Sequence, residues 1–196
     1  MLRRSAFVTI ALCAGLSTGC EAIVDALIGE PDADVEHPKS FSHSGLSFSY
    51  PGNWEVEAEQ ETIEDIGVTT LTVESSGSAL LMIVQYQPSG EFGEDYAEEF
   101  LDDVVKEMAA TADGAFTVKS LGVQDATRTL FGREVRGRQK ALSTSMLGEK
   151  VPHTQRAFVV DLEDRSVVTY SQIADEDAKK ARPGFELVLD SLAIKD

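Results

Sequence analysis

Cys20 is the residue whose position in the sequence most clearly indicates a chemical role. It follows two arginines, Arg3 and Arg4, then an uncharged apolar run over residues 6–16, then small residues at 17–19. This is the order of an export signal with a cleavage site before the cysteine. An apolar run of about a dozen residues spans about 18 Å as a helix, against about 30 Å of bilayer hydrocarbon. The run therefore does not predict a permanent membrane span.

The segment Leu16-Ser-Thr-Gly-Cys20 resembles the lipobox of bacterial lipoproteins, with Leu16 one place further from the cysteine than is usual. In those proteins a diacylglycerol is attached to the thiol, and cleavage leaves an acylated N-terminus with chains such as palmitate. The resemblance implies a signal peptide over residues 1–19 and lipidation of Cys20. Ordinary secretion is the alternative, because Ser17 and Gly19 also satisfy the small-x-small cleavage rule.

The cysteine count agrees with lipidation. The chain has two cysteines, and Cys13 lies within residues 1–19, so the processed chain keeps a single thiol and no intrachain disulfide. The resemblance then implies a protein of the bacterial cell envelope that faces the periplasm, held to the membrane by its lipid. The residue after Cys20 is Glu21 and not the aspartate that is associated with retention in the inner membrane. This favours delivery to the outer membrane. A secreted protein is the alternative location.

The charge of the chain excludes one class of partner. The formal net charge is −17, and removal of residues 1–19, with Arg3 and Arg4 and no acidic residue, takes it to −19. Such a charge repels the phosphate backbone, so no nucleic-acid partner is expected.

A basic stretch interrupts this acidic background. It comprises Arg128, Arg133, Arg136, Arg138, Lys140, Lys150 and Arg156, opposed in the same span by Glu134 and Glu149. In a strand, Arg136, Arg138 and Lys140 would share one face. This basic stripe has two interpretations. It neutralises the acidic residues at 95–103 inside the fold, or it docks an anionic partner such as lipid headgroups, polysaccharide or an acidic protein patch.

Other chemistry-bearing motifs predict no site. A G-x-S-x-G match at residues 15–19 falls in the expected signal peptide, where no strand-to-helix turn can form. His37, His43 and His153 lack the close spacing of zinc ligands. We therefore predict no catalytic residue, no metal site and no cofactor.

Two regions follow the signal. Residues 20–40 are acidic and contain prolines, which predicts a flexible tether behind the lipidated cysteine. Residues 41–196 are enough for one globular domain with a single core.

Alternating and continuous apolar patterns predict the elements of that domain. Residues 46–50 and 54–58 predict a hairpin around a turn at 51–53, and two more strands are predicted at 66–73 and 79–86. A helix is expected where Tyr96, Phe100, Val104 and Met108 recur every four residues. The later strands are expected at 116–123, 130–141, 153–162 and 166–173.

The C-terminal part predicts two short helical pieces. A helical turn begins at Asp175, Pro183 interrupts it, and a second helix runs over 183–190 before a last strand at 192–194.

Two segments carry a family resemblance. Gly45-Leu-Ser-Phe-Ser-Tyr-Pro-Gly-Asn-Trp54 and Phe185-Glu-Leu-Val-Leu-Asp-Ser-Leu192 resemble PsbP-like proteins. That superfamily includes the extrinsic photosystem II protein and bacterial lipoproteins of the DcrB type. The resemblance implies an α+β fold in which helices sandwich an antiparallel sheet, and an accessory or binding role without a catalytic motif to transfer.

These observations favour one function class and leave two alternatives. The favoured one is a lipid-anchored accessory or binding protein of the cell envelope, not an enzyme, whose partners are the membrane through its anchor and an envelope protein or polysaccharide. The alternatives are an exported hydrolase-like enzyme with an unrecognised site and a carrier of an apolar ligand.

Overall fold

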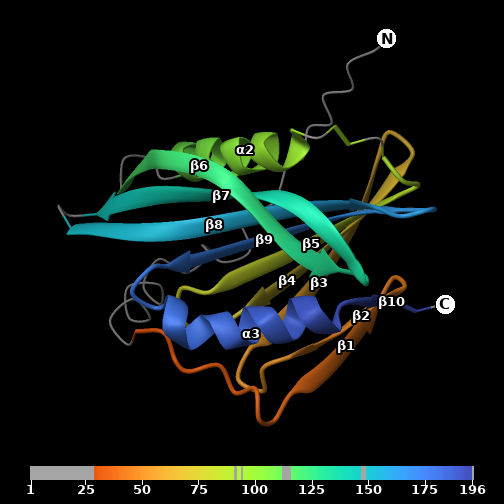
Figure 1. The fold of residues 1–196 in the computed structure, drawn as a ribbon, viewed down its shortest axis with the longest axis horizontal. Coiled ribbons are helices and arrows are strands. Elements are labelled where there is room, and N and C mark those ends of the chain that lie inside the picture. The colour runs from red at the N-terminus through yellow and green to blue at the C-terminus, as the bar shows by residue number, and fades with distance from the viewer. Residues whose placement is uncertain (1–28, 91, 94, 112–115, 147–148, 196) are drawn as a thin grey trace.

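The computed structural model describes residues 29–90, 92–93, 95–111, 116–146 and 149–195. These residues form ten strands and two helices (Figure 1). In chain order the elements are β1 (Lys39–His43), β2 (Leu46–Tyr50), β3 (Glu55–Ile63), β4 (Ile66–Glu74), β5 (Leu80–Gln87), α2 (Tyr96–Thr111), β6 (Phe116–Leu130), β7 (Arg133–Met146), β8 (Glu149–Asp161), β9 (Ser166–Ala174), α3 (Ala178–Ser191) and β10 (Ala193–Ile194).

The strands form two sheets in which the paired strands run antiparallel. The large sheet has seven strands in the order β3-β4-β5-β9-β8-β7-β6, and the small sheet has the order β1-β2-β10. Helix α2 covers one face of the large sheet, and α3 covers the other face beside the small sheet (Figure 1). The predicted α+β fold, an antiparallel sheet between helices, is confirmed.

Each helix covers its own hydrophobic core. Strand β5 contributes to both cores, because successive side chains of a strand point to opposite faces. Leu81 and Ile83 pack in the core on the α3 side, whereas Met82 and Val84 pack beneath α2. The continuous apolar run of this strand follows from the burial of both its faces.

The helix predicted from the four-residue recurrence is α2. Phe100 and Val104 are buried in the core beneath it, and Met108 is partly buried there. The predicted strands at 66–73 and 79–86 correspond to β4 and β5. These elements were predictable because the pattern of buried residues repeats within each segment, every four residues in the helix and as alternating or continuous apolar residues in the strands.

The strand expected over 130–141 is divided by a turn. Strand β6 ends at Leu130, and β7 begins at Arg133 directly opposite it. The two residues between them, Phe131 and Gly132, have φ angles of 51° and 74°. Two central residues with positive φ fit the turn that connects tightly joined antiparallel strands.

The hairpin predicted around residues 51–53 is wrong. Strand β2 pairs with β1 and β10 in the small sheet, whereas β3 pairs with β4 in the large sheet. The turn at Pro51 therefore carries the chain from one sheet to the other. Turn residues specify a change of direction, but they do not specify the partner of the following strand.

The predicted break at Pro183 is also wrong, because α3 is one helix with Pro183 inside it. Buried residues on both sides of the proline, including Ala181, Phe185 and Val188, attach the helix to the core. An internal proline costs about 3 kcal/mol of helix stability, and packing of this face offsets that cost.

The second half of the expected tether lies against the domain. Glu30 is 1% exposed, and its Oε2 accepts hydrogen bonds from the backbone N–H groups of Ser78 and Ala79 at 2.6 and 3.1 Å. The Ala33 N–H donates to the carbonyl of Lys180 in α3 at 3.2 Å. Polar contacts, which hydrophobic patterns do not reveal, thus hold this segment, which we call the N-terminal strap (residues 29–38).

Within the part of the chain described above, no helix is long and apolar enough to cross a membrane.

Candidate functional site: an arginine-lined cavity beneath α3

A cavity of about 300 Å³ lies between α3 and the part of the large sheet formed by β6 to β9. Three arginines from three different elements line it, namely Arg128 of β6, Arg156 of β8 and Arg182 of α3. A smaller hollow of about 50 Å³ shares Arg156 and Arg182 in its lining, so the same gap extends along the helix. We call this the arginine cavity.

The strand register brings the polar residues of the sheet to the cavity. Gln139 of β7 is directly opposite Arg156 of β8, and Arg128 of β6 is directly opposite Val135 of β7. Val135 belongs to the core on the α3 side, so these positions share the face that α3 covers. Arg182 reaches the same space from the helix.

The three guanidinium groups are incompletely neutralised. Arg156 Nε donates to Gln139 Oε1 at 2.7 Å, and Arg128 Nη2 forms an ion pair with Asp190 at 2.6 Å. The Nε atom of Arg128 is buried and has no hydrogen-bond partner in the described part of the chain. No hydrogen bond or ion pair joins the Arg182 side chain to any other described residue.

The electrostatics of the cavity agree with this geometry. Burial is the largest cause that lowers the pKa of Arg156, and the positive charges of Arg182 and Arg128 lower it further, whereas Glu186 opposes the shift. Guanidinium groups keep their protons at neutral pH, so the cavity concentrates positive charge within an acidic protein.

Apolar side chains from both the sheet and α3 also line the cavity. Phe158 of the sheet and Phe185 and Leu189 of α3 line it, and all three are less than 9% exposed. The cavity thus combines donors that suit a carboxylate or a phosphate with a surface that suits a hydrocarbon group.

The basic stripe predicted from the sequence lies on the opposite face of β7, toward α2. Lys140 is 1% exposed and pairs with Asp102, and Arg138 pairs with Glu98 of α2 and Asp125 of β6. These ion pairs agree with the interpretation that the stripe neutralises acidic residues inside the fold. Because Lys140 is buried, it has no surface to offer a docked partner.

Arg136, the third residue of the stripe, is exposed, and no ion pair holds it within the described residues. A docking role remains a prediction for Arg136. Cys20, the predicted lipidation site, lies outside the described residues.

The histidines occupy separate elements. His43 lies in β1 and His153 in β8, while His37 of the N-terminal strap contacts Asp34 through Nδ1 at 3.1 Å. The described residues contain no group of three His, Cys, Asp or Glu side chains that could hold a metal ion.

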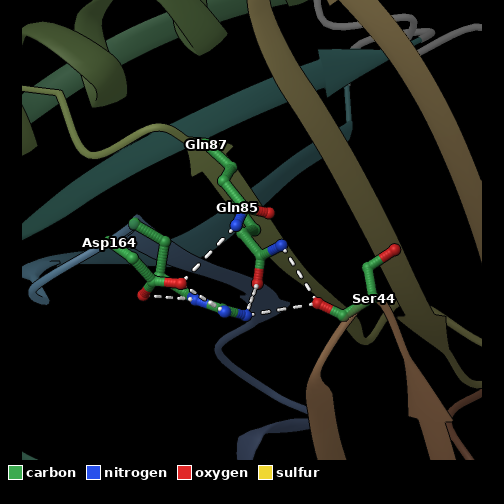
Figure 2. Close-up of polar contacts among 5 residues, drawn as sticks. Ser44, Gln85, Gln87 and Asp164 are labelled. Atoms are coloured by element: carbon green, nitrogen blue, oxygen red, sulfur yellow. Dashed lines mark hydrogen bonds and ion pairs between the residues drawn. The ribbon is translucent and has the colours of Figure 1, made fainter. Parts of the chain in front are cut away.

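A second polar cluster joins the two sheets (Figure 2). Arg165 Nη1 donates to the Ser44 carbonyl at 3.3 Å and to Gln85 Oε1 at 3.2 Å, and Gln85 Nε2 donates to the same carbonyl at 3.2 Å. Asp164 accepts from Arg165 Nη2 at 2.7 Å. Because its arginine has a carboxylate partner, this cluster acts as a brace between the β1–β2 turn and the large sheet.

The sequence did not identify the arginine cavity. Arg128 and Arg156 belong to the predicted basic stretch, but Arg182 lies where a helix break was expected. In a continuous helix, Arg182, Phe185 and Leu189 share one face, since residues three, four and seven apart are neighbours on a helix. Recognition of one uninterrupted helix would have shown this amphipathic pattern.

Comparison with known proteins identifies the fold. No family model matches the chain, and no curated protein matches it. The solution structure of cyanobacterial PsbP (CyanoP) from Synechocystis sp. PCC 6803 matches with a TM-score of 0.51 at 11% identity, over 81% of this chain and 92% of that chain. At this identity the match shows the fold alone, and the predicted PsbP-like fold is confirmed.

Two other solved structures resemble the chain more weakly. LpqN of Mycobacterium tuberculosis, described as involved in cell envelope biogenesis, has a TM-score of 0.40 at 11% identity, over 82% of this chain and 92% of that chain. A protein from Bacteroides thetaiotaomicron has a TM-score of 0.41 at 12% identity, over 81% of this chain and 48% of that chain.

Proposed function

We propose that this chain, with its PsbP-like fold, is a lipid-anchored accessory protein of the bacterial cell envelope whose domain binds a ligand in the arginine cavity. The observation that carries the proposal is the gathering of Arg128, Arg156 and Arg182 around one cavity, where only Arg128 forms an ion pair with a carboxylate among the described residues.

The sequence supports the anchor. An export signal ends at Cys20, and the processed chain keeps that one thiol. A single acyl chain gives marginal membrane binding, whereas several chains give a stable anchor without a spanning helix. The periplasmic face and the outer membrane, favoured by Glu21, belong to the same proposal, with secretion as the alternative.

The arginines of the cavity lining support the binding of an anion. A guanidinium group that keeps its proton cannot act as a general base, so the arginines suit the recognition of an anion. They also disfavour a purely apolar cargo, because burial of an unpaired cation against hydrocarbon is costly. The enzyme and the apolar carrier remain the alternatives to the binding protein.

The anchor is tested with Cys20→Ser in the full chain, with Cys13→Ser as the matched control. We expect the native chain and Cys13→Ser to incorporate a labelled fatty acid and to sediment with the membrane fraction. Cys20→Ser should lose both properties. Retention of Cys20→Ser in the membrane fraction would overturn an anchor through Cys20, and absence of label from the native chain would favour a secreted protein.

A further inference from the structure

The donors of the arginine cavity specify a class of ligand. Arg156 uses Nε to bond Gln139, and no carboxylate forms an ion pair with it among the residues described. Arg182 lines the same space and likewise has no carboxylate partner within the described chain. Two guanidinium groups with free N–H donors that face a shared space form a site for an oxyanion.

We propose that the arginine cavity binds a small amphiphilic organic oxyanion, with its head between Arg156 and Arg182 and its hydrocarbon part against Phe185 and Leu189. This inference rests on the proposed function, because it assumes that the cavity is the ligand site. The shared chemistry is a head with at least two acceptor oxygens, which both carboxylates and phosphate monoesters supply.

The position of the head follows from the partners already present. Asp190 binds Arg128 and thereby leaves that residue least available, although its buried Nε still lacks a partner within the described chain. Gln139 fixes Arg156 through Nε, and a planar guanidinium held at Nε keeps its other N–H groups for a ligand. Arg182 comes from the opposite wall, so an anion would connect the sheet and α3.

The mutual repulsion of the cavity arginines supports the same ligand. The positive charges of Arg182 and Arg128 both act on Arg156, and burial adds to their effect. Binding of an anion would relieve this repulsion in a partly desolvated space, where interactions between charges are stronger than in water. Glu186 supplies only part of this compensation from the same wall.

The size of the cavity sets the size of the ligand. A volume of about 300 Å³ is at the lower end of the range of about 300 to 1,000 Å³ for small-molecule sites. Phe185 and Leu189 lie one turn apart on α3 and provide the apolar wall for a short hydrocarbon group. The cavity therefore has the size of a site for a small molecule.

Isothermal titration calorimetry on the full chain with Cys20→Ser tests this proposal. The probes are hexanoate and hexyl phosphate, with hexan-1-ol as the neutral control and hexylamine as the cationic control. We expect both anions to bind at least about tenfold more tightly than hexanol, since hydrogen bonds to charged groups have this effect on affinity. The ratio of the two anion affinities identifies the preferred head, and hexylamine should not bind.

Arg182→Gln should weaken binding of the anions about tenfold or more and leave hexanol unaffected. Because Arg182 is exposed, this variant should fold, which a thermal melt verifies. Lys119→Gln is the matched control, since it removes an exposed positive charge that does not line the cavity and should not change binding. Arg156→Gln gives a second test at the sheet wall.

The outcomes separate this inference from the proposed function. Binding of hexanol as tight as binding of the anions, unchanged in Arg182→Gln, would overturn the oxyanion class and keep the cavity as a binding site. Binding of no probe would overturn both the ligand class and the role of the cavity. Equal loss of binding in Lys119→Gln and Arg182→Gln would show a general charge effect and would also overturn the proposed site.

Discussion

Gly184 of α3 lies against the indole ring of Trp54, so closely that a Cβ at position 184 would be 2.6 Å from Trp54 Cζ2. The added Cβ at position 184 would also lie 2.9 Å from Pro51 Cγ. Trp54 is 1% exposed and packs edge-on against Phe185, with ring centroids 5.4 Å apart. Pro51 and Trp54 of the Tyr-Pro-x-x-Trp segment therefore form the surface on which α3 packs.

Gly184→Ala should destabilise the domain. Alanine is favoured over glycine in a helix by about 1 kcal/mol, but overpacking against the fixed ring of Trp54 costs about 1 to 3 kcal/mol. We expect a net loss in the free energy of unfolding measured in urea. Gly93→Ala is the control, because a Cβ there meets no atom within 4 Å. A variant as stable as the native chain would show that α3 can shift freely.

Asp102→Asn should be strongly destabilising compared with Asp103→Asn. The side chain of Lys140 is 2% exposed and pairs with Asp102, so the variant leaves a buried ammonium group without its counter-charge. Because Asp102 is half exposed, we expect a loss of about 2 kcal/mol, less than for a fully buried pair. Asp103 pairs with Lys106 in solvent, where an ion pair contributes less than about 1 kcal/mol.

Urea denaturation of the two variants measures this difference. The double variant Asp102→Asn with Lys140→Met should recover much of the loss, since no unpaired charge then remains. Equal stability of Asp102→Asn and Asp103→Asn would contradict a buried charge pair beneath α2.

His153 should make the domain less stable in weak acid. Burial lowers its pKa, while the Val151 carbonyl and the charges of Asp175, Asp177 and Glu176 oppose the shift. The folded chain then binds a proton less readily than the unfolded chain, so stability is complete above a pH of about 6.5 and falls as the pH decreases. His153→Gln should reduce this slope between about pH 7 and about pH 5 in urea titrations. An unchanged slope in His153→Gln would contradict this role of His153.

Glu30→Ala should release the N-terminal strap. The variant removes the acceptor of the Ser78 and Ala79 N–H groups and of the Ser75 hydroxyl. Hydrogen exchange of the Ser78 and Ala79 amides should accelerate, with a loss of about 1 to 3 kcal/mol in stability. Glu36→Ala, at an exposed strap position, should leave these amides protected. Unchanged exchange in Glu30→Ala would show that the strap is held by other contacts.

The sequence predicted those elements whose burial repeats within one segment. The four-residue period of α2 and the apolar run of β5 are local properties, and both elements were predicted near their observed bounds. The partner of β2 was mispredicted, because pairing depends on which distant strand reaches it, here β1 and β10. The continuity of α3 through Pro183 depends on a core that a local pattern does not contain.

The arginine cavity shows the same limit. The basic stretch was evident in the sequence, and the two-residue period placed Arg136, Arg138 and Lys140 on one face. The period does not reveal that α2 supplies Glu98 and Asp102 to that face. Nor does it show that Arg128 and Arg156 meet Arg182 on the other face, because that meeting requires α3 to pack across β6 to β9.

The contact of Glu30 with the β4–β5 turn limits the distance from the membrane that the domain can reach. Ten residue steps separate Cys20 from Glu30, and a fully extended chain covers at most about 36 Å over that length. With the proposed acyl group on Cys20, the domain explores only a thin shell above the bilayer. A ligand released at that membrane would meet the cavity at a raised effective concentration, so tether length would decide which molecules the domain encounters.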